Sequence, residues 1–123
     1  MKKESNKFAI DAIKKAENKN AVEKLVLFQL SSKHDMGSKQ SVNWKSLDNF
    51  IDDFSEKWQS LGDLAEKTQL SLVKVSRAIE TLEKDKLITR KTVDTKTKKA
   101  KVIGKHEVIS LTPTIFENYK NMN

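Results

Sequence analysis

The side chains with the clearest chemical capacity in this sequence are cations gathered in one segment. Residues 86–105 carry eight Lys or Arg side chains against a single carboxylate, Asp94, so the segment has a net charge of +7. The whole chain of 123 residues also has a net charge of +7, and its remaining residues therefore sum to zero. A concentrated cationic excess is the electrostatic signature of a surface for a polyanion such as nucleic acid. The alternative reading is a solvated surface loop.

Residues suited to catalysis or metal binding are sparse. The chain has no cysteine, and His34 and His106 have no metal-ligand spacing around them. It contains no glycine-rich phosphate loop and no nucleophile motif. Four acidic side chains are interpreted as a solvated helix face rather than a catalytic pair: Asp48, Asp52, Asp53 and Glu56. We therefore expect no enzymatic activity, no metal and no cofactor.

Composition narrows the class of protein further. The lack of cysteine fits a reducing, intracellular compartment. The N-terminus has no apolar run typical of a signal peptide, and the apolar cluster at 25–30 is too short to span a bilayer. We expect a cytoplasmic protein without a membrane partner, folded as one domain over residues 1–123. Three glycines and one proline disfavour a β-rich fold with many tight turns.

Residues 1–58 are expected to form helices in front of the functional segment. Apolar spacing predicts a first helix over 3–18, and Asn20 followed by Glu23 predicts a capping box that opens a second helix over 21–34. Residues 35–42 are read as a loop. A third helix is expected over 43–57, with one apolar face that includes Trp44, Phe50 and Trp58. That face is interpreted as core or dimer packing, with one wall of a ligand cavity as the alternative.

Residues 60–84 carry the pattern of two short helices joined by a tight turn. Ser60 is suited to cap the first helix, and the small Ala65 lets the second helix cross closely. Residues 68–70 form the turn, and Ser71 caps the second helix, expected over 71–84. The inner face of this second helix is predicted to hold Leu72 or Val75, with Ala78, Ile79 and Leu82. Its outer face is predicted to hold Val73, Lys74, Ser76, Arg77 and Thr81.

A β-hairpin and a final helix are predicted after residue 86. Residues 87–93 read as a strand, 94–105 as a polar basic loop and 106–111 as the returning strand. A C-terminal helix is expected over 113–121, with Pro113 at its first position. The predicted fold class is mainly α with a small β-hairpin (α+β). It is a winged helix-turn-helix with additional N-terminal helices, in which 60–84 is the helix-turn-helix and 87–111 the wing.

Over residues 60–119 the sequence resembles the MarR-type winged-helix family of bacterial regulators. The resemblance runs through Leu64-Ala65-Glu66-Lys67, Leu70-Ser71, Val75-Ser76-Arg77, Leu82-Glu83-Lys84 and Leu87-Ile88, and again through Val108-Ile109-Ser110-Leu111-Thr112. Two positions where the family often has glycine differ here. Gln69 stands in the turn, and Asp85-Lys86 follows the second helix; we expect Asp85 to take the positive φ that glycine would supply.

The resemblance implies that the second helix enters the major groove of double-stranded DNA. Lys74, Ser76 and Arg77 are then the candidates for base edges, and Arg77 is suited to a bidentate contact with guanine. An ion pair of Arg77 with Glu80 or Asp63 is the alternative. The candidate residues in the recognition helix are Ser71, Val73, Lys74, Ser76 and Arg77. The candidates for phosphate and wing contacts are Lys67, Arg90, Lys96, Lys98, Lys99 and Lys101.

These expectations favour a dimeric transcriptional regulator, because one recognition helix covers only a half-site and a homodimer reads two. A replication, partition or transfer accessory factor of a plasmid or phage, bound to repeated DNA sites, is an alternative. A winged helix used only for protein interaction is a second alternative, although it gives little reason for the concentrated charge. The sequence identifies no small-molecule effector.

Overall fold

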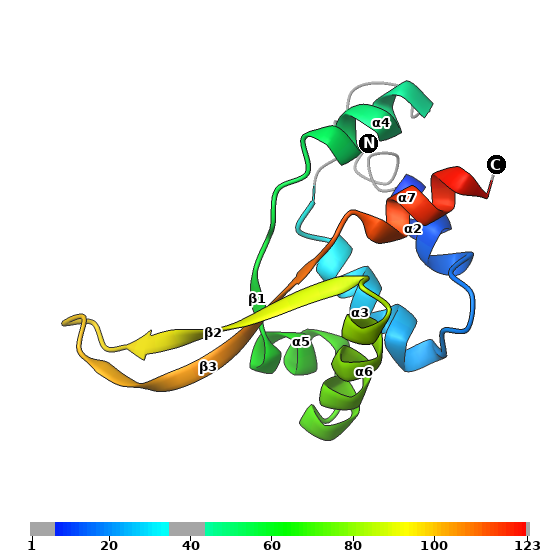
Figure 1. Cartoon of the computed structure of the whole chain (residues 1–123). Helices are drawn as coiled ribbons and strands as arrows, with labels where there is room; N and C mark the ends of the chain where they lie inside the picture. Colours follow the sequence, from blue (N-terminus) through cyan, green and yellow to red (C-terminus); the bar gives the residue numbers. More distant parts are fainter. Residues whose placement is uncertain (1–6, 35–43, 123) are drawn as a thin grey trace.

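The computed structural model describes residues 7–34 and 44–122 (Figure 1). Residues 3–6 of the first predicted helix and the predicted loop at 35–42 lie outside this part of the chain. The elements in chain order are α2 (Lys7–Lys14), α3 (Ala21–Ser31), α4 (Trp44–Asp52), β1 (Gln59–Ser60), α5 (Leu61–Thr68), α6 (Leu72–Lys84), β2 (Ile88–Lys96), β3 (Val102–Leu111) and α7 (Thr114–Asn121). Within the described ranges, no helix is long and apolar enough to cross a bilayer.

The three strands form one antiparallel sheet in the order β1-β3-β2. The sequence analysis missed β1, which pairs Gln59 with Ile109 and Ser60 with Val108. A strand of two residues is too short to show an alternating pattern. Together, α3, β1, α5, α6 and the β2–β3 hairpin give the element order of a winged helix-turn-helix. The predicted fold class, mainly α with a small sheet (α+β), is therefore confirmed, and α3 supplies its first core helix.

The helices before the sheet are shorter than predicted. The capping box of α3 is confirmed, because Glu23 N–H donates to Asn20 Oδ1 at 2.8 Å and Asn20 N–H donates to Glu23 Oε1 at 3.1 Å. The third helix was predicted over 43–57, but α4 ends at Asp52. The chain after it must extend to reach β1, and Lys57 N–H donates to Ser110 Oγ of β3 at 2.9 Å. Tertiary pairing with the sheet therefore overrides the local apolar pattern.

One hydrophobic cluster joins the N-terminal helices to the helix-turn-helix. Val75, Ile79 and Leu82 of α6 are buried in it, together with Leu27 of α3 and Phe116 of α7. The alternative left open between Leu72 and Val75 is settled, because Val75 is fully buried and Leu72 is exposed. The inner face of α6 thus follows a three- and four-residue spacing that begins at Val75.

The helix ends on either side of α6 use two non-glycine residues in the left-handed region. Gln69 has a φ of 59°, which fits a turn position where the MarR-type family often has glycine. After α6, Asp85 has a φ of −85° and Lys86 has a φ of 63°, so the prediction that Asp85 takes the positive φ is wrong. Lys86 N–H donates to the Glu83 carbonyl, and Leu87 N–H donates to the Leu82 carbonyl, both at 3.0 Å. This bond pair is a Schellman motif, and it fixes the left-handed residue at position 86.

Lys86→Gly is expected to raise the free energy of unfolding by about 0.5–1 kcal/mol. Glycine removes the left-handed penalty of roughly 1–2 kcal/mol and loses part of that gain through its more flexible unfolded chain. Chemical denaturation at neutral pH measures the change. The matched control is Lys84→Gly, at the last helical residue of α6, which should lower stability because glycine is unfavourable at a helical position. A lower midpoint for Lys86→Gly would contradict the assigned backbone geometry.

The β2–β3 hairpin is a long ribbon that extends from the body of the molecule (Figure 1). Its strands continue to Lys96 and resume at Val102, so the turn spans only 97–101. The prediction of a basic loop over 94–105 is therefore wrong for most of that range. Cross-strand pairs such as Asp94 with Lys105 and Val93 with His106 continue the ladder. The polar, lysine-rich composition of this stretch had hidden the strand signal.

The C-terminal helix α7 packs against α2 and α4. Pro113 precedes α7 as its N-cap residue, rather than occupying the first helical position as predicted. Tyr119 donates a hydrogen bond to Asp11 of α2, and burial together with this bond raises the pKa of Tyr119 to about 12. The same hydrogen bond lowers the pKa of Asp11. The N- and C-terminal helices are thereby joined on the side of the molecule away from the hairpin turn (Figure 1).

Candidate nucleic-acid interface

Two serine caps set the start of the helices in the helix-turn-helix. Ser60 Oγ accepts from Asp63 N–H at 3.1 Å, and Ser71 Oγ accepts from Lys74 N–H at 3.2 Å. Both caps match the prediction. Leu64 and Ala65 on the inner face of α5 are buried. The small Ala65 lets α5 and α6 pack closely. The face of α6 that points away from this contact is directed to solvent.

The predicted contact residues of α6 lie on its solvent face. Val73, Lys74 and Arg77 are exposed, Ser76 is half-buried, and Ser71 is exposed at the cap. Val73 and Arg77 are four residues apart, and they face away from the buried stripe of Val75, Ile79 and Leu82. The structure thus brings the predicted recognition residues together along one uncovered edge, with Lys67 exposed in the last turn of α5.

The guanidinium of Arg77 has no ion-pair partner within the described ranges. The sequence had left open a pairing with Glu80 or Asp63. Both carboxylates are exposed, and neither lies within ion-pair distance of Arg77. A planar guanidinium with five donors is consequently free to bind a ligand from solvent.

The base of the hairpin is electrostatically compensated by the protein itself. Arg90 Nε lies 3.0 Å from Glu83 Oε1 of α6, and Arg90 Nη1 lies 3.8 Å from Glu107 Oε1 of β3. Lys91 Nζ lies 4.2 Å from the ring centroid of Trp58, a cation–π contact. Arg90 therefore links the hairpin to the recognition helix. From sequence, Arg90 was predicted as a ligand contact and Trp58 as part of an apolar helix face, and neither of these partners was predicted.

The tip of the hairpin carries four exposed lysines without ion-pair partners among the described residues. Lys96, Lys98, Lys99 and Lys101 are exposed, and none of them forms an ion pair in the described part of the chain. The turn itself is ordered by Thr97, whose backbone N–H donates to the Lys101 carbonyl at 2.9 Å and whose Oγ1 accepts from Lys101 N–H at 3.2 Å. Four exposed ammonium groups close together at the end of the hairpin create a local positive potential.

The other candidate chemical groups are dispersed. His106 contacts Thr95 across the hairpin at 2.6 Å, and Asp48 pairs with Lys120 of α7. Asp52, Asp53 and Glu56 are exposed. In the ranges that the structure describes, no three His, Asp or Glu side chains are grouped as a metal site would require.

His34 is buried against aromatic rings after α3. Its ring stacks on Phe54 with centroids 4.7 Å apart and meets Phe50 edge-on at 6.0 Å. The Nε2 atom has no hydrogen-bond partner among the described residues. Burial, and secondarily the charge of Lys57, lowers the pKa of His34 from its ordinary value of 6.5. The neutral ring is thus the form that fits this packing.

Stability is expected to fall as the pH is lowered below 6.5. The unfolded chain takes up a proton on His34 near that pH, while the folded chain resists protonation until its lowered pKa is reached. Denaturation midpoints measured from pH 7.5 down to about 5, where most carboxylates are still ionised, should decline for the native chain. The decline should be smaller in His34→Phe and unchanged in the exposed-histidine control His106→Ala. Equal declines in all three proteins would contradict the assignment to His34.

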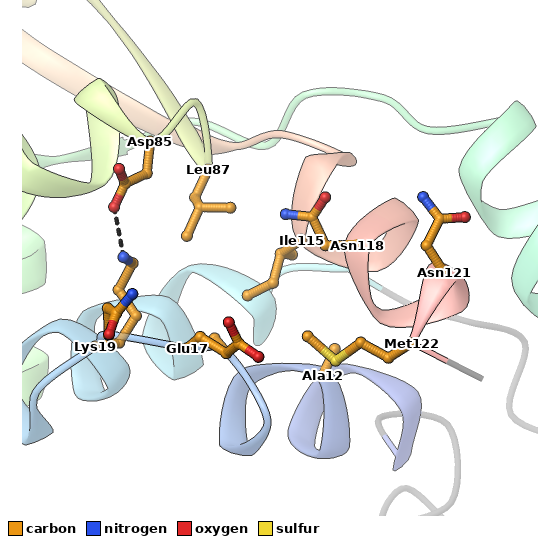
Figure 2. Close-up of a pocket in the computed structure, with 11 residues that line it drawn as sticks. Ala12, Glu17, Lys19, Asp85, Leu87, Ile115, Asn118, Asn121 and Met122 are labelled. Carbon is orange, nitrogen blue, oxygen red and sulfur yellow. Dashed lines mark hydrogen bonds and ion pairs between the residues drawn. The ribbon is translucent and has the colours of Figure 1, made fainter.

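A pocket with a volume of about 550 Å³ lies between α2, α7 and the turn after α6 (Figure 2). Its wall mixes the carboxamides of Asn118 and Asn121 with aliphatic groups such as Ile115 and Met122. The ion pair of Lys19 with Asp85 lies at one side of it, next to the end of the recognition helix (Figure 2). Among the side chains that the structure describes, none from α4 lines this pocket.

The fold is that of a winged helix-turn-helix, with an uncovered outer face on α6 and a cationic hairpin. No family model and no curated protein sequence matches the chain. Among solved structures, a possible transcriptional regulator from Methanosarcina mazei Go1 is similar, with a TM-score of 0.48 and 14% sequence identity. The superposition covers 91% of this chain and 76% of that one.

Proposed function

We propose that this protein binds double-stranded DNA sequence-specifically as a non-catalytic, homodimeric transcriptional regulator. In this proposal α6 lies in the major groove, with Lys74, Ser76 and Arg77 at base edges. Ser71 and Lys67 contact phosphates beside the groove, and the lysines of the hairpin tip follow the backbone or the adjacent minor groove. The MarR-type resemblance of residues 60–119 supports the same arrangement.

The observation that supports the proposal most is the contrast between compensated and free cations. Arg90 and Lys91 at the hairpin base have partners in the protein, whereas Arg77 and the tip lysines have none in the described ranges. Other exposed lysines, such as Lys33, also have no ion pair among the described residues, but at the tip four lysines lie within six consecutive residues. DNA affinity comes largely from such phosphate-facing cations.

The homodimer in this proposal uses the side that carries α2 and α7. These helices pack together, and the apolar side chains of Ile10 and Met122 remain exposed there, at 37% and 48%. A two-fold contact through this side leaves both recognition helices and both hairpins free. It predicts a target made of two half-sites related by symmetry.

Selection of bound duplexes from a random-sequence pool tests the proposal. The full chain is expected to enrich one inverted-repeat motif at moderate salt, with half-sites separated by about one helical turn. The same experiment separates the alternatives. Enrichment of direct repeats in arrays indicates a replication, partition or transfer factor. Retention of no duplex at low or moderate salt indicates a protein-interaction module and refutes DNA binding.

A further inference from the structure

The first turn of the recognition helix exposes two aliphatic side chains that the core does not use. Leu72 and Val73 are 55% and 60% exposed, while Val75, three residues after Leu72, is fully buried. The buried stripe of α6 is complete without them. Single exposed aliphatic residues are common in proteins, so the exposure alone carries little information.

The exposed pair of Leu72 and Val73 has polar and cationic neighbours. Leu72 and Val73 lie between the cap residue Ser71 and the cations Lys74 and Arg77, on the edge proposed above to enter the groove. A ligand there must present negative charge and an apolar group side by side. The major groove does so at thymine, whose C5-methyl group projects from the base edge beside the phosphates. In 5-methylcytosine the same methyl group occupies the same edge.

A second copy of this chain is the competing occupant of the pair. A two-fold contact through Leu72 and Val73 would place each Lys74 and Arg77 next to its counterpart, and like charges oppose such an interface. No carboxylate in the first turn of α6 compensates them, since that turn contains no acidic residue. The charge of the patch therefore favours a polyanion over self-association.

We infer that Leu72 and Val73 are specificity-determining residues that contact a C5-methyl group in the major groove. The inference rests on the proposed function and adds to it the chemical group of the DNA that these residues recognise, a C5-methyl group. Leu72 was predicted as a possible core residue, and only its exposure assigns it to this edge. Ser76, four residues after Leu72, lies beside it on the same helix face and is placed to contact the same base step.

The test removes the methyl group without changing any hydrogen bond. In the duplex recovered from the random pool, each thymine is replaced in turn by deoxyuridine, and in a second series each cytosine by 5-methylcytosine. Fluorescence anisotropy should show that uracil at one or two positions weakens binding by about fourfold, the effect of one buried methyl-sized group. A gain on methylation of a cytosine, with no loss at uracil, identifies 5-methylcytosine as the methyl that is read.

Protein variants assign the effect to residues. Leu72→Ala and Val73→Ala should bind the thymine duplex more weakly and lose their response to uracil, and both side chains are exposed enough for the fold to persist. Leu25→Ala, at a 45% exposed leucine of α3, is the matched control and should keep the full response. If no uracil and no 5-methylcytosine substitution changes the affinity, the inference is refuted while DNA recognition stands. An equal response in native and variant proteins refutes the assignment to Leu72 and Val73, and loss of all duplex binding refutes the function itself.

Discussion

Arg77→Ala is expected to weaken binding to the selected duplex by roughly 5- to 150-fold, which corresponds to about 1–3 kcal/mol for one bidentate contact with guanine. The side chain is exposed and has no ion-pair partner in the described ranges, so its removal leaves no buried group unpaired. Stability should therefore remain within about 0.5 kcal/mol of the native value, as for other surface changes. Anisotropy titrations and thermal unfolding measure the two quantities.

Two companion variants separate base recognition from charge. Arg77→Lys keeps the positive charge but loses the planar, bidentate guanidinium. Compared with Arg77→Ala, it should bind random duplexes more tightly but should not regain the affinity for the selected duplex. Lys33→Ala removes an exposed cation outside the proposed interface and should change little. If Arg77→Ala bound the selected duplex as tightly as the native chain, with its fold intact, the contact to a base edge would be refuted.

Replacing the four lysines of the hairpin tip is expected to have the largest effect on salt dependence. Each phosphate contact contributes about 0.9 to the slope of log affinity against log salt. The variant with alanine at Lys96, Lys98, Lys99 and Lys101 should therefore lose about 3–4 units of slope for each bound protomer, and Lys98→Ala with Lys99→Ala about 2 for each protomer. The loss should be alike for selected and random duplexes, because phosphates carry no sequence information.

The control for the two-lysine variant removes the same charge elsewhere. Lys33→Ala combined with Lys57→Ala deletes two exposed cations that lie outside α2, α6, α7 and the hairpin, and should leave the slope nearly unchanged. A slope that responds equally to both double variants would show that net charge, and not the hairpin, sets the salt dependence. An unaltered slope in the four-lysine variant would show that the hairpin tip does not touch phosphate.

The recognition helix could be predicted from sequence because several local signals agree on it. Its buried stripe follows the helical period from Val75 to Leu82, and Ser71 caps it as predicted. The end of α4 carries no such signal. Phe54 and Trp58 continue the apolar spacing of α4, but the chain leaves the helix there to pair with the sheet. Long-range pairing of this kind is invisible to a local pattern.

The same limit applies to the proposed interface. The exposed face of α6 followed from periodicity, but the partners of individual cations did not. Arg90 and the tip lysines look alike in sequence, and only the fold brings Glu83 and Glu107 to Arg90. The extent of the hairpin was hidden because 94–96 and 102–105, which extend its strands, contain few apolar residues and show no alternation of apolar and polar types. Leu72 was misjudged as possible core because its apolar type suits either face.

The most direct test of the account is an amide chemical-shift titration of the 14.1 kDa chain with the selected duplex, at a salt concentration that favours specific binding. Binding through the proposed surface predicts the largest shifts at residues 71–77 and 96–101, with small changes in α2 and α7. Shifts confined to α2, α4 and α7, with the edge of α6 and the hairpin tip unmoved, would contradict it.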